Sequence, residues 1–418
     1  MKNLRVLSLF SGCGGMDIGF EGNFDVRAKC VNDKTRRDMI HERHDNGYVT
    51  VKKTRFTTVF ANDILPEAKI AWTRFFKKKY GIDGDQIYYL DSIVDLVKRH
   101  ENGEQIFPDN IDVVTGGFPC QDFSAAGKRR GFKSRKNHLG QYVDNVDDCT
   151  METRGMLYYW MKRVIDIVKP KVFIAENVKG LTNLDNVKDI IQHDFSSANG
   201  NGYIVLPPRV LHAADYGVAQ SRERVIFIGI RVDALHDGVL DILKQGNDMP
   251  REWNPYPIPT HSFNWKGDIL VPHATCRDVI GELMEPDKSL DLSHANYSRC
   301  KFMGKHCQGN KEIDMDGIAP TIRSEHHGNI EFRRLSFEHD GTHYDEINSG
   351  LQERRLTLRE CGLLQSFPPD YEFYIPKNNH DDGVSTSKAY KIIGNAVPPL
   401  LAYNIATRLE FLWEKFFK

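Results

Sequence analysis

Leu4-Arg-Val-Leu-Ser-Leu-Phe-Ser-Gly-Cys-Gly-Gly15 is the stretch that decides the fold class. Residues 4–9 form an apolar run typical of a buried strand, glycines interrupt it, and helical spacing follows from Met16. Closely spaced glycines let the backbone approach a ligand, and the amino terminus of a helix favours negative groups. The spacing differs from the Gly-x-Gly-x-x-Gly pattern that cradles a pyrophosphate. The stretch therefore predicts a strand, a ligand-binding turn and a helix.

The same alternation continues along the chain. Strand-like runs at 57–61, 111–115, 171–175 and 224–230 are separated by segments with helical spacing. Strands that alternate with helices predict an open parallel sheet, with helices on both faces and ligands beyond the carboxyl ends of the strands. We therefore expect an α/β fold with a Rossmann-like sheet.

The texture of the sequence changes at about residue 232, where Pro, Trp, His and Asn become scattered and helical periodicity is lost. We expect a domain at 1–231, a smaller irregular domain at 232–350, and a segment at 351–418 that completes the first domain. A charged stretch at 29–55 is interpreted as an insertion, with a hairpin as its expected structure.

Composition excludes several classes of protein. The 418 residues are 40% hydrophobic and 27% charged, which is ordinary for globular proteins, and we find no apolar run long enough to span a membrane. Eight scattered cysteines are typical of reduced thiols in a soluble cytoplasmic protein, and they lack the spacing of a zinc site, so we expect no metal. The net charge of −1 means that any contact with nucleic acid depends on local basic patches.

Cys120 is the best candidate for a nucleophile. It ends Gly116-Gly-Phe-Pro-Cys120, in which Pro119 stops the preceding strand because it has no amide hydrogen. A buried cysteine is usually only a small apolar side chain, but such a cysteine does not need two glycines and a proline before it. The cations of 127–136 suit the binding of a phosphate backbone, although a solvated surface loop has the same composition.

Other polar side chains follow strands at the same expected edge. Asp63 stands where nucleotide-binding folds place a carboxylate for ribose hydroxyls, with a capping role as the equal alternative. Glu176 could hold a proton if burial raises its pKa, or could cap a helix. Arg222 and Arg224 lie on one side of an extended segment and suit binding of a carboxylate, a phosphate or a carbonyl oxygen; the alternative is a charged edge strand.

Taken in order, these segments resemble the motifs of the DNA cytosine-5 methyltransferase family, of the prokaryotic restriction-modification type. The resemblance covers nearly the whole chain, and its segments are 10–20, 62–64, 91–93, 118–121, 153–157, 176–178, 220–224, 359–368 and 394–399. The irregular domain at 232–350 coincides with the family's target-recognition domain.

The resemblance implies the fold of an S-adenosyl-L-methionine-dependent methyltransferase and a mechanism on a cytosine flipped out of the duplex. Cys120 would add to C6, Glu176 would stabilise charge at N3, and Arg222 and Arg224 would orient the base through its O2. The residues implied for the methyl donor are Phe10, Gly12, Gly14, Asp63, Ile64, Asp91, Ser92, Leu157, Asn395 and Ala396. Those expected to contact DNA are Gln121, Ser124, Lys128, Arg129, Arg130, Thr321 and Arg323.

The implied partners are double-stranded DNA and a cognate restriction endonuclease that acts independently, and we expect a monomer with no membrane contact. Position 64 is Ile where the family often has an aromatic side chain, and the 29–55 insertion is longer than the expected link. The same scaffold and chemistry would serve a tRNA cytosine-5 methyltransferase, although the large 232–350 region favours duplex DNA. An alternative outside the enzymes is a non-catalytic member of the family that binds DNA or partners. The intact set of Cys120, Glu176 and Arg222 argues against this alternative. A nicotinamide-dependent dehydrogenase is disfavoured because the dinucleotide fingerprint is missing.

Overall fold

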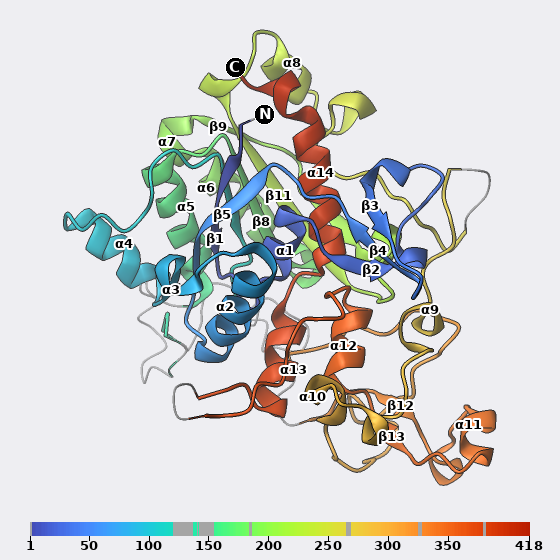
Figure 1. Ribbon diagram of the computed structural model, residues 1–418. Helices are drawn as coiled ribbons and strands as arrows, with labels where there is room; N and C mark the ends of the chain where they lie inside the picture. Colours follow the sequence, from blue (N-terminus) through green and yellow to red (C-terminus); the bar gives the residue numbers. More distant parts are fainter. Residues whose placement is uncertain are drawn as a thin grey trace.

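A central sheet organises the larger part of the molecule (Figure 1). The computed structural model describes residues 2–119, 137–139, 141, 154–183, 186–264, 269–324, 328–378 and 382–418. Over these residues the sheet has eight strands in the order β10-β11-β8-β7-β1-β5-β6, and β9 also pairs with β11. The strands are β1 Leu4–Leu9, β5 Phe56–Asp63, β6 Tyr88–Leu90, β7 Val113–Gly116, β8 Val172–Val178, β9 Tyr203–Val205, β10 Arg209–His212 and β11 Glu223–Arg231.

The expected parallel pairing is confirmed for β1, β5, β6, β7 and β8. It is wrong for the run at 224–230, because β11 runs antiparallel to β8, β9 and β10. The link from His212 to Glu223 is short and contains no crossover helix long enough to return the chain for a parallel pair. As a consequence, the amino end of β11 lies at the edge where β7 and β8 end.

Helices cover both faces of the sheet, as predicted. One face packs against α1, α2 and α14, with Val6 and Trp72 in its core, and the other packs against α4, α5 and α6, with Leu7 and Met161 in its core. Side chains of adjacent β1 residues enter opposite cores because a strand alternates its faces. The bounds are α1 Gly15–Glu21, α2 Pro66–Tyr80, α3 Gly84–Ile87, α4 Ile93–Glu101, α5 Leu157–Val168, α6 Val187–Ser196, α7 Ala198–Asn201 and α14 Pro399–Phe416.

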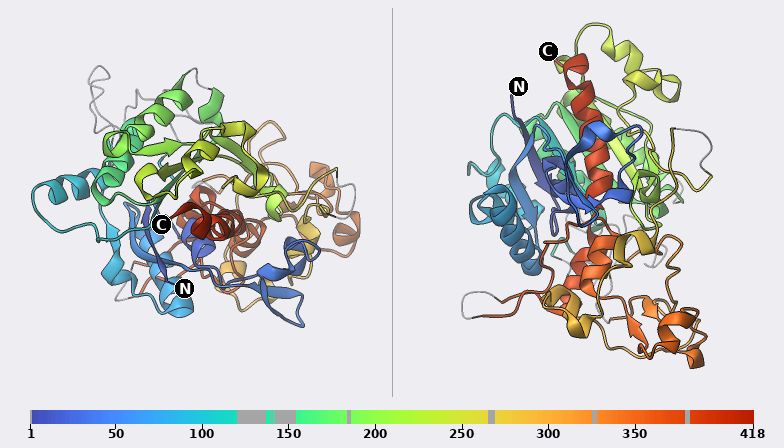
Figure 2. Two further views of the ribbon diagram at one scale, coloured as in Figure 1. Left: turned by 90° about the horizontal axis from the view of Figure 1, so that it is seen from above. Right: turned by 45° about the vertical axis from the view of Figure 1, so that its right-hand side comes forward.

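The carboxyl-terminal helix α14 runs across the sheet beside α1 (Figures 1 and 2). The two helices approach closely at Gly19, where an added Cβ would lie 2.4 Å from the Cβ of Ala402. The last segment of the chain therefore packs into the core that the first segment begins.

Most of the remaining elements are short and gather below the sheet in Figure 1, whereas α8 (Val239–Leu243) lies at the top of this view, near the carboxyl terminus. The elements below are α9 Cys276–Ile280, α10 Leu292–Ala295, α11 Tyr344–Asn348, α12 Leu358–Leu364, α13 Thr386–Asn395, β12 Phe332–Arg334 and β13 Arg354–Arg355. Ion pairs add to the apolar core of this region: buried Arg334 lies between Glu285 and Glu346, and Arg354 lies between Glu285 and Glu360.

The insertion supplies β3 (Ile40–Arg43) and β4 (Tyr48–Val51), and β4 also pairs with β2 (Asp25–Arg27), which precedes the insertion, to give a three-stranded antiparallel sheet. The β3-β4 pair confirms the expected hairpin. The Asn32 amide donates to the carbonyl oxygens of Thr260 and Ile269 at 2.8 Å each. The insertion is therefore hydrogen-bonded to two residues of the predicted smaller domain at 232–350.

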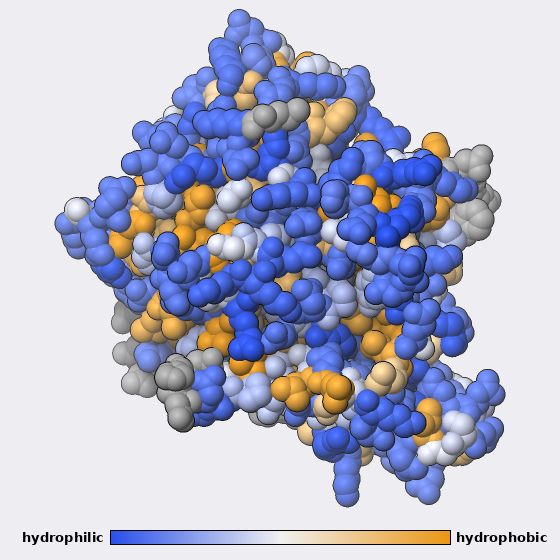
Figure 3. Space-filling model, viewed as in Figure 1, coloured by the Kyte–Doolittle hydropathy of each residue, from blue (hydrophilic) through white to orange (hydrophobic). Residues whose placement is uncertain are grey.

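The face shown in Figure 3 is mainly hydrophilic, as expected for a chain with 27% charged residues. Within the described ranges, no helix combines the length and the apolar character needed to cross a membrane.

Candidate active site

The end of β8 and the start of β11 bring two of the candidate catalytic side chains, Glu176 and Arg224, together. Glu176 lies near the end of β8, and Arg224 pairs in register with Val178 of the same strand. The Nε of Arg224 lies 2.7 Å from Oε1 of Glu176, and each side chain is only 10% exposed. The antiparallel direction of β11 is what places this arginine beside the glutamate.

Glu176 lies directly beneath the turn that leads to Cys120. A Cβ added to Gly117 would lie 2.8 Å from Oε2 of Glu176, so a side chain at this position would displace the carboxyl group. Burial raises the pKa of Glu176, and the positive charges of Arg224 and Arg222 oppose that rise. The carboxyl group thus lies beside the turn that precedes Cys120, in surroundings that favour its protonated form.

Asn177 is hydrogen-bonded to the same turn. Its Nδ2 donates to the carbonyl oxygen of Phe118 at 3.1 Å, and its Oδ1 accepts from the amide of Val178 at 2.9 Å. We assigned Asn177 no role from the sequence; its place between Glu176 and Val178 was the available signal. The predicted residues Cys120, Gln121, Ser124, Lys128, Arg129 and Arg130 lie outside the described residues.

Arg222 ties distant segments of backbone together. Its guanidinium donates to the carbonyl oxygen of Ile322 at 3.0 Å and to those of Gly394 and Ala396 at 2.8 Å each. The side chain is buried and lies close enough to Glu176 to influence its pKa. These contacts give Arg222 a structural role, and its predicted contact with the base stays a prediction.

The glycine turn after β1 has the open backbone expected of a ligand-binding turn. Phe10 and Gly12 both have φ of 52°, and no atom lies within 4 Å of an ideal Cβ at Gly12. At Gly14, by contrast, a Cβ would lie 2.7 Å from the Trp72 ring, so this glycine is required for packing against α2. Gly12 thus borders free space, and Gly14 closes the turn against the core.

Asp63 lies at the end of β5 beside this turn. It accepts hydrogen bonds from the amides of Gly12 and Leu65, both at 3.0 Å, and burial raises its pKa. Its neighbour Ile64 and Leu90 at the end of β6 are each 40% exposed. Two exposed aliphatic side chains on adjacent strand ends offer an apolar wall for a flat ring; Leu90 was not among our predicted residues.

Asp91 and Ser92, which are also predicted to bind the methyl donor, lie around the same edge of the sheet. The Asn62 amide donates to the carbonyl oxygen of Asp91 at 2.7 Å, whereas the Asp91 carboxylate pairs with Arg99 at 3.0 Å. The Ser92 hydroxyl caps α4 and hydrogen-bonds with Nδ1 of His138 at 2.7 Å.

The remaining residues predicted to bind the methyl donor are Leu157, Asn395 and Ala396. Leu157 is buried at the start of α5, Ala396 is buried, and Asn395 is exposed. The 394–397 turn reaches the glycine turn, because a Cβ on Gly15 would lie 2.1 Å from the carbonyl oxygen of Val397.

Two of the residues that we expect to contact DNA, Thr321 and Arg323, are among the described residues. Both form hydrogen bonds within the protein. Thr321 donates from its hydroxyl to the carbonyl oxygen of Ser221. Arg323 donates to Oε1 of Gln308 at 2.9 Å and to the carbonyl oxygen of Asn329 at 2.8 Å. The Arg323 guanidinium therefore ties the two ends of the 323–329 segment, and its predicted contact with a base stays a prediction.

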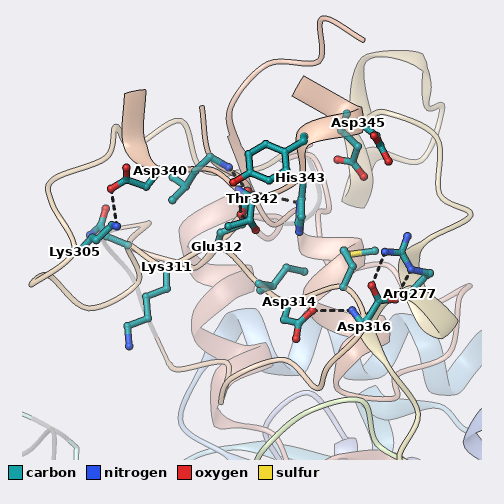
Figure 4. A pocket seen from close by; sticks show the side chains of 16 residues that line it. Arg277, Lys305, Lys311, Glu312, Asp314, Asp316, Asp340, Thr342, His343 and Asp345 are labelled. Carbon is teal, nitrogen blue, oxygen red and sulfur yellow. Dashed lines mark hydrogen bonds and ion pairs between the residues drawn. The ribbon is translucent and has the colours of Figure 1, made fainter. Parts of the chain in front are cut away.

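A pocket of about 640 Å³ lies elsewhere, in the smaller region between 310–316 and 340–346 (Figure 4). Its walls are charged and internally paired: Arg277 binds Asp316 at 2.6 Å, and Lys305 binds Asp340 at 2.6 Å. None of the predicted site residues lines it. Among the described residues there is also no group of His, Cys, Asp or Glu suited to hold a metal ion.

Comparisons with known proteins agree with this geometry. Residues 4–410 match the family described as C-5 cytosine-specific DNA methylase. The Type II methyltransferase M.BspRI of Lysinibacillus sphaericus is 30% identical over 424 residues, covering 96% of this chain and 80% of that protein. The Type II methyltransferase M.BsuRI of Bacillus subtilis is 29% identical over 415 residues, covering 97% and 78%. A solved structure of a Spodoptera frugiperda DNMT2 mutant has a TM-score of 0.52 at 16% identity over 98% of this chain and 100% of that one, which shows similarity of fold.

Proposed function

Because the chain belongs to the C-5 cytosine-specific DNA methylase family, we propose that it transfers a methyl group from S-adenosyl-L-methionine to C5 of cytosine in duplex DNA. The observation that carries the proposal is the buried Glu176–Arg224 pair, 2.7 Å apart, beneath the turn that leads to Cys120. The pair supports the proposal because an activated pyrimidine ring needs a carboxyl group that can hold a proton and a cation that keeps this group in position.

The chemistry requires activation because C5 of cytosine is a weak nucleophile. The Cys120 thiolate forms a bond to C6, and the electron pair of the C5–C6 double bond becomes available at C5 while N3 gains charge. Glu176, its pKa raised by burial, supplies a proton or a hydrogen bond at N3, and Arg224 keeps the carboxyl group in place. After C5 has accepted the methyl group, loss of the C5 proton to a base, which we leave unassigned, and cleavage of the S–C6 bond release Cys120.

The edge formed by β1, β5 and β6 fits the methyl donor, which supplies an electrophilic methyl on a sulfonium ion. Free space at Gly12 admits its backbone side, Asp63 offers a carboxylate for ribose hydroxyls, and Ile64 and Leu90 offer apolar surface for adenine. The remaining predicted donor residues complete this site in our proposal: Phe10, Gly14, Asp91, Ser92, Leu157, Asn395 and Ala396.

We further propose that the region at 232–350 selects a short duplex sequence, and that the enzyme protects DNA against a cognate restriction endonuclease. The relatives M.BspRI and M.BsuRI are named Type II methyltransferases, which supports this assignment.

The test is transfer of labelled methyl from S-adenosyl-L-methionine to unmethylated duplex DNA, with tRNA as a parallel substrate. Cys120→Ser should abolish the label at cytosine C5, whereas the same exchange at Cys307, an exposed cysteine, should not. DNA that carries 5-fluorocytosine should trap a covalent adduct with the wild type, because fluorine at C5 leaves no proton to remove. Label confined to tRNA, or transfer that survives Cys120→Ser, would contradict the proposal.

A further inference from the structure

Polar side chains from distant parts of the chain meet in a fully buried cluster behind the active site. Gln220 and Gln365 have no exposed surface and Arg222 is 1% exposed. Gln220 and Arg222 precede β11, whereas Gln365 follows α12. Burial of an amide is costly unless its hydrogen bonds are satisfied, so the partners of these side chains are held in fixed positions relative to them.

The hydrogen bonds of the cluster form a continuous path. The amide of Ile322 donates to Oε1 of Gln220 at 3.0 Å, and Nε2 of Gln220 donates to Oε1 of Gln365 at 3.2 Å. Nε2 of Gln365 then donates to the carbonyl oxygens of Ile393 at 2.8 Å and Ala396 at 2.7 Å. Both the donor and the acceptor ends of the Gln365 amide are therefore engaged.

The two ends of the path belong to the two binding regions of the proposed function. Ala396 is one of the residues proposed to line the methyl-donor site. Ile322 lies between Thr321 and Arg323, in the segment expected near DNA. Arg222 spans the same two ends, since it donates to the carbonyl oxygens of Ile322 and Ala396. A shift of one end consequently breaks buried hydrogen bonds unless the other end moves with it.

We propose that Gln365, with Gln220, is a positioning residue that couples binding of the methyl donor to binding of DNA; this inference rests on the proposed function. Ordering of the 395–396 turn by the donor fixes Gln365, Gln365 orients Gln220, and Gln220 holds the backbone amide of Ile322. By linkage the effect is reciprocal, and couplings of this kind change affinity by about 5- to 150-fold.

The experiment measures the dissociation constant of S-adenosylhomocysteine, the donor's product, by calorimetry with and without duplex DNA that contains the target sequence. The ratio of the two constants is the coupling factor. In the wild type it should be about fivefold or more. Gln365→Leu, which removes every hydrogen bond of this amide, should lower the factor clearly below the wild-type value, to the part that Arg222 still carries, while each ligand alone still binds.

Gln220→Leu should have the same effect, and the double variant should lose no more than either single variant, because one path is broken in each case. Asn404→Leu is the matched control: it removes another buried amide, on α14, whose bonds run to Leu400 and Tyr216. Its coupling factor should match the wild type. Thermal unfolding confirms that each variant is folded, and Gln365→Glu, which keeps the shape but loses the donors, replaces Gln365→Leu if the latter does not fold.

A wild-type coupling factor of one would overturn the inference and leave the proposed function standing. A coupling factor that stays at the wild-type value in Gln365→Leu and Gln220→Leu, or an equal loss in Asn404→Leu, would overturn it as well. A wild type that binds the product but no duplex DNA would overturn the proposed function and the inference together.

Discussion

Replacement of Glu176 by glutamine separates the two roles that the structure gives this side chain. The variant keeps the shape and the acceptor that Arg224 contacts at 2.7 Å, but it removes the negative charge and the exchangeable carboxyl proton. The new side-chain amide could still donate an N–H to the base, but it could not deliver a proton to it.

The effects on stability and on rate should differ in size. Burial raises the pKa of Glu176, so its ionised form costs stability, and a neutral amide that still accepts from Arg224 should change the free energy of unfolding by no more than about 1–2 kcal/mol. A change of that size leaves a domain with an ordinary stability of about 5–15 kcal/mol folded. General acid catalysis contributes about 10²- to 10⁴-fold, which corresponds to about 3–5 kcal/mol of activation free energy. The effect on rate should therefore exceed any effect of unfolding.

The assay is single-turnover methyl transfer at saturating donor and DNA, followed across pH. The rate of the wild type should fall as pH rises through the raised pKa of Glu176, because the protonated form is lost there. The glutamine variant should be slower by about 10²-fold or more and should lack this step.

Glu223→Gln is the matched control, since Glu223 begins the same strand as Arg224, is 41% exposed and pairs with Lys179 at 2.8 Å. Exposed pairs contribute about 0–1 kcal/mol, so its rate should stay near that of the wild type. A Glu176→Gln variant with the wild-type rate, or one whose loss is explained by weaker binding of donor or DNA, would refute the reasoning.

Three further changes test other parts of the structure. Gly117→Ala should slow single-turnover transfer by on the order of 10²-fold at unchanged melting temperature, because its Cβ would lie 2.8 Å from Oε2 of Glu176; an unimpaired rate would contradict this. Burial raises the pKa of Asp17 from 3.8 to about 6. Ionisation of this group should therefore cost the wild type up to about 3 kcal/mol of stability between about pH 4 and pH 8. Urea unfolding of Asp17→Asn should lack that loss, and an equal loss in the variant would contradict the assignment. Arg334→Met removes the buried cation that lies 3.1 Å from Glu285, and it should lower the free energy of unfolding by about 3–5 kcal/mol. A variant as stable as the wild type would disprove this prediction.

Local pattern was sufficient for much of the fold and for the order of the motifs. The strand at 4–9, the glycine turn and the helix after it could be predicted because apolar periodicity and glycine spacing act over a few residues. The same holds for Asp63 and Glu176, since polar residues at the ends of parallel strands meet at one edge of a sheet.

The sequence by itself determined which residues are candidates for the proposed chemistry: a cysteine after Gly-Gly-Phe-Pro, a carboxylate near the end of a buried strand, and the glycine turn for a methyl donor. Only the tertiary structure decided how these parts are oriented and joined. The antiparallel direction of β11 places Arg224 against Glu176, and Gln365 meets Gln220 across 145 residues of sequence. Strand direction and buried contacts of this kind depend on how the whole chain closes on itself, and no local pattern of residues records that.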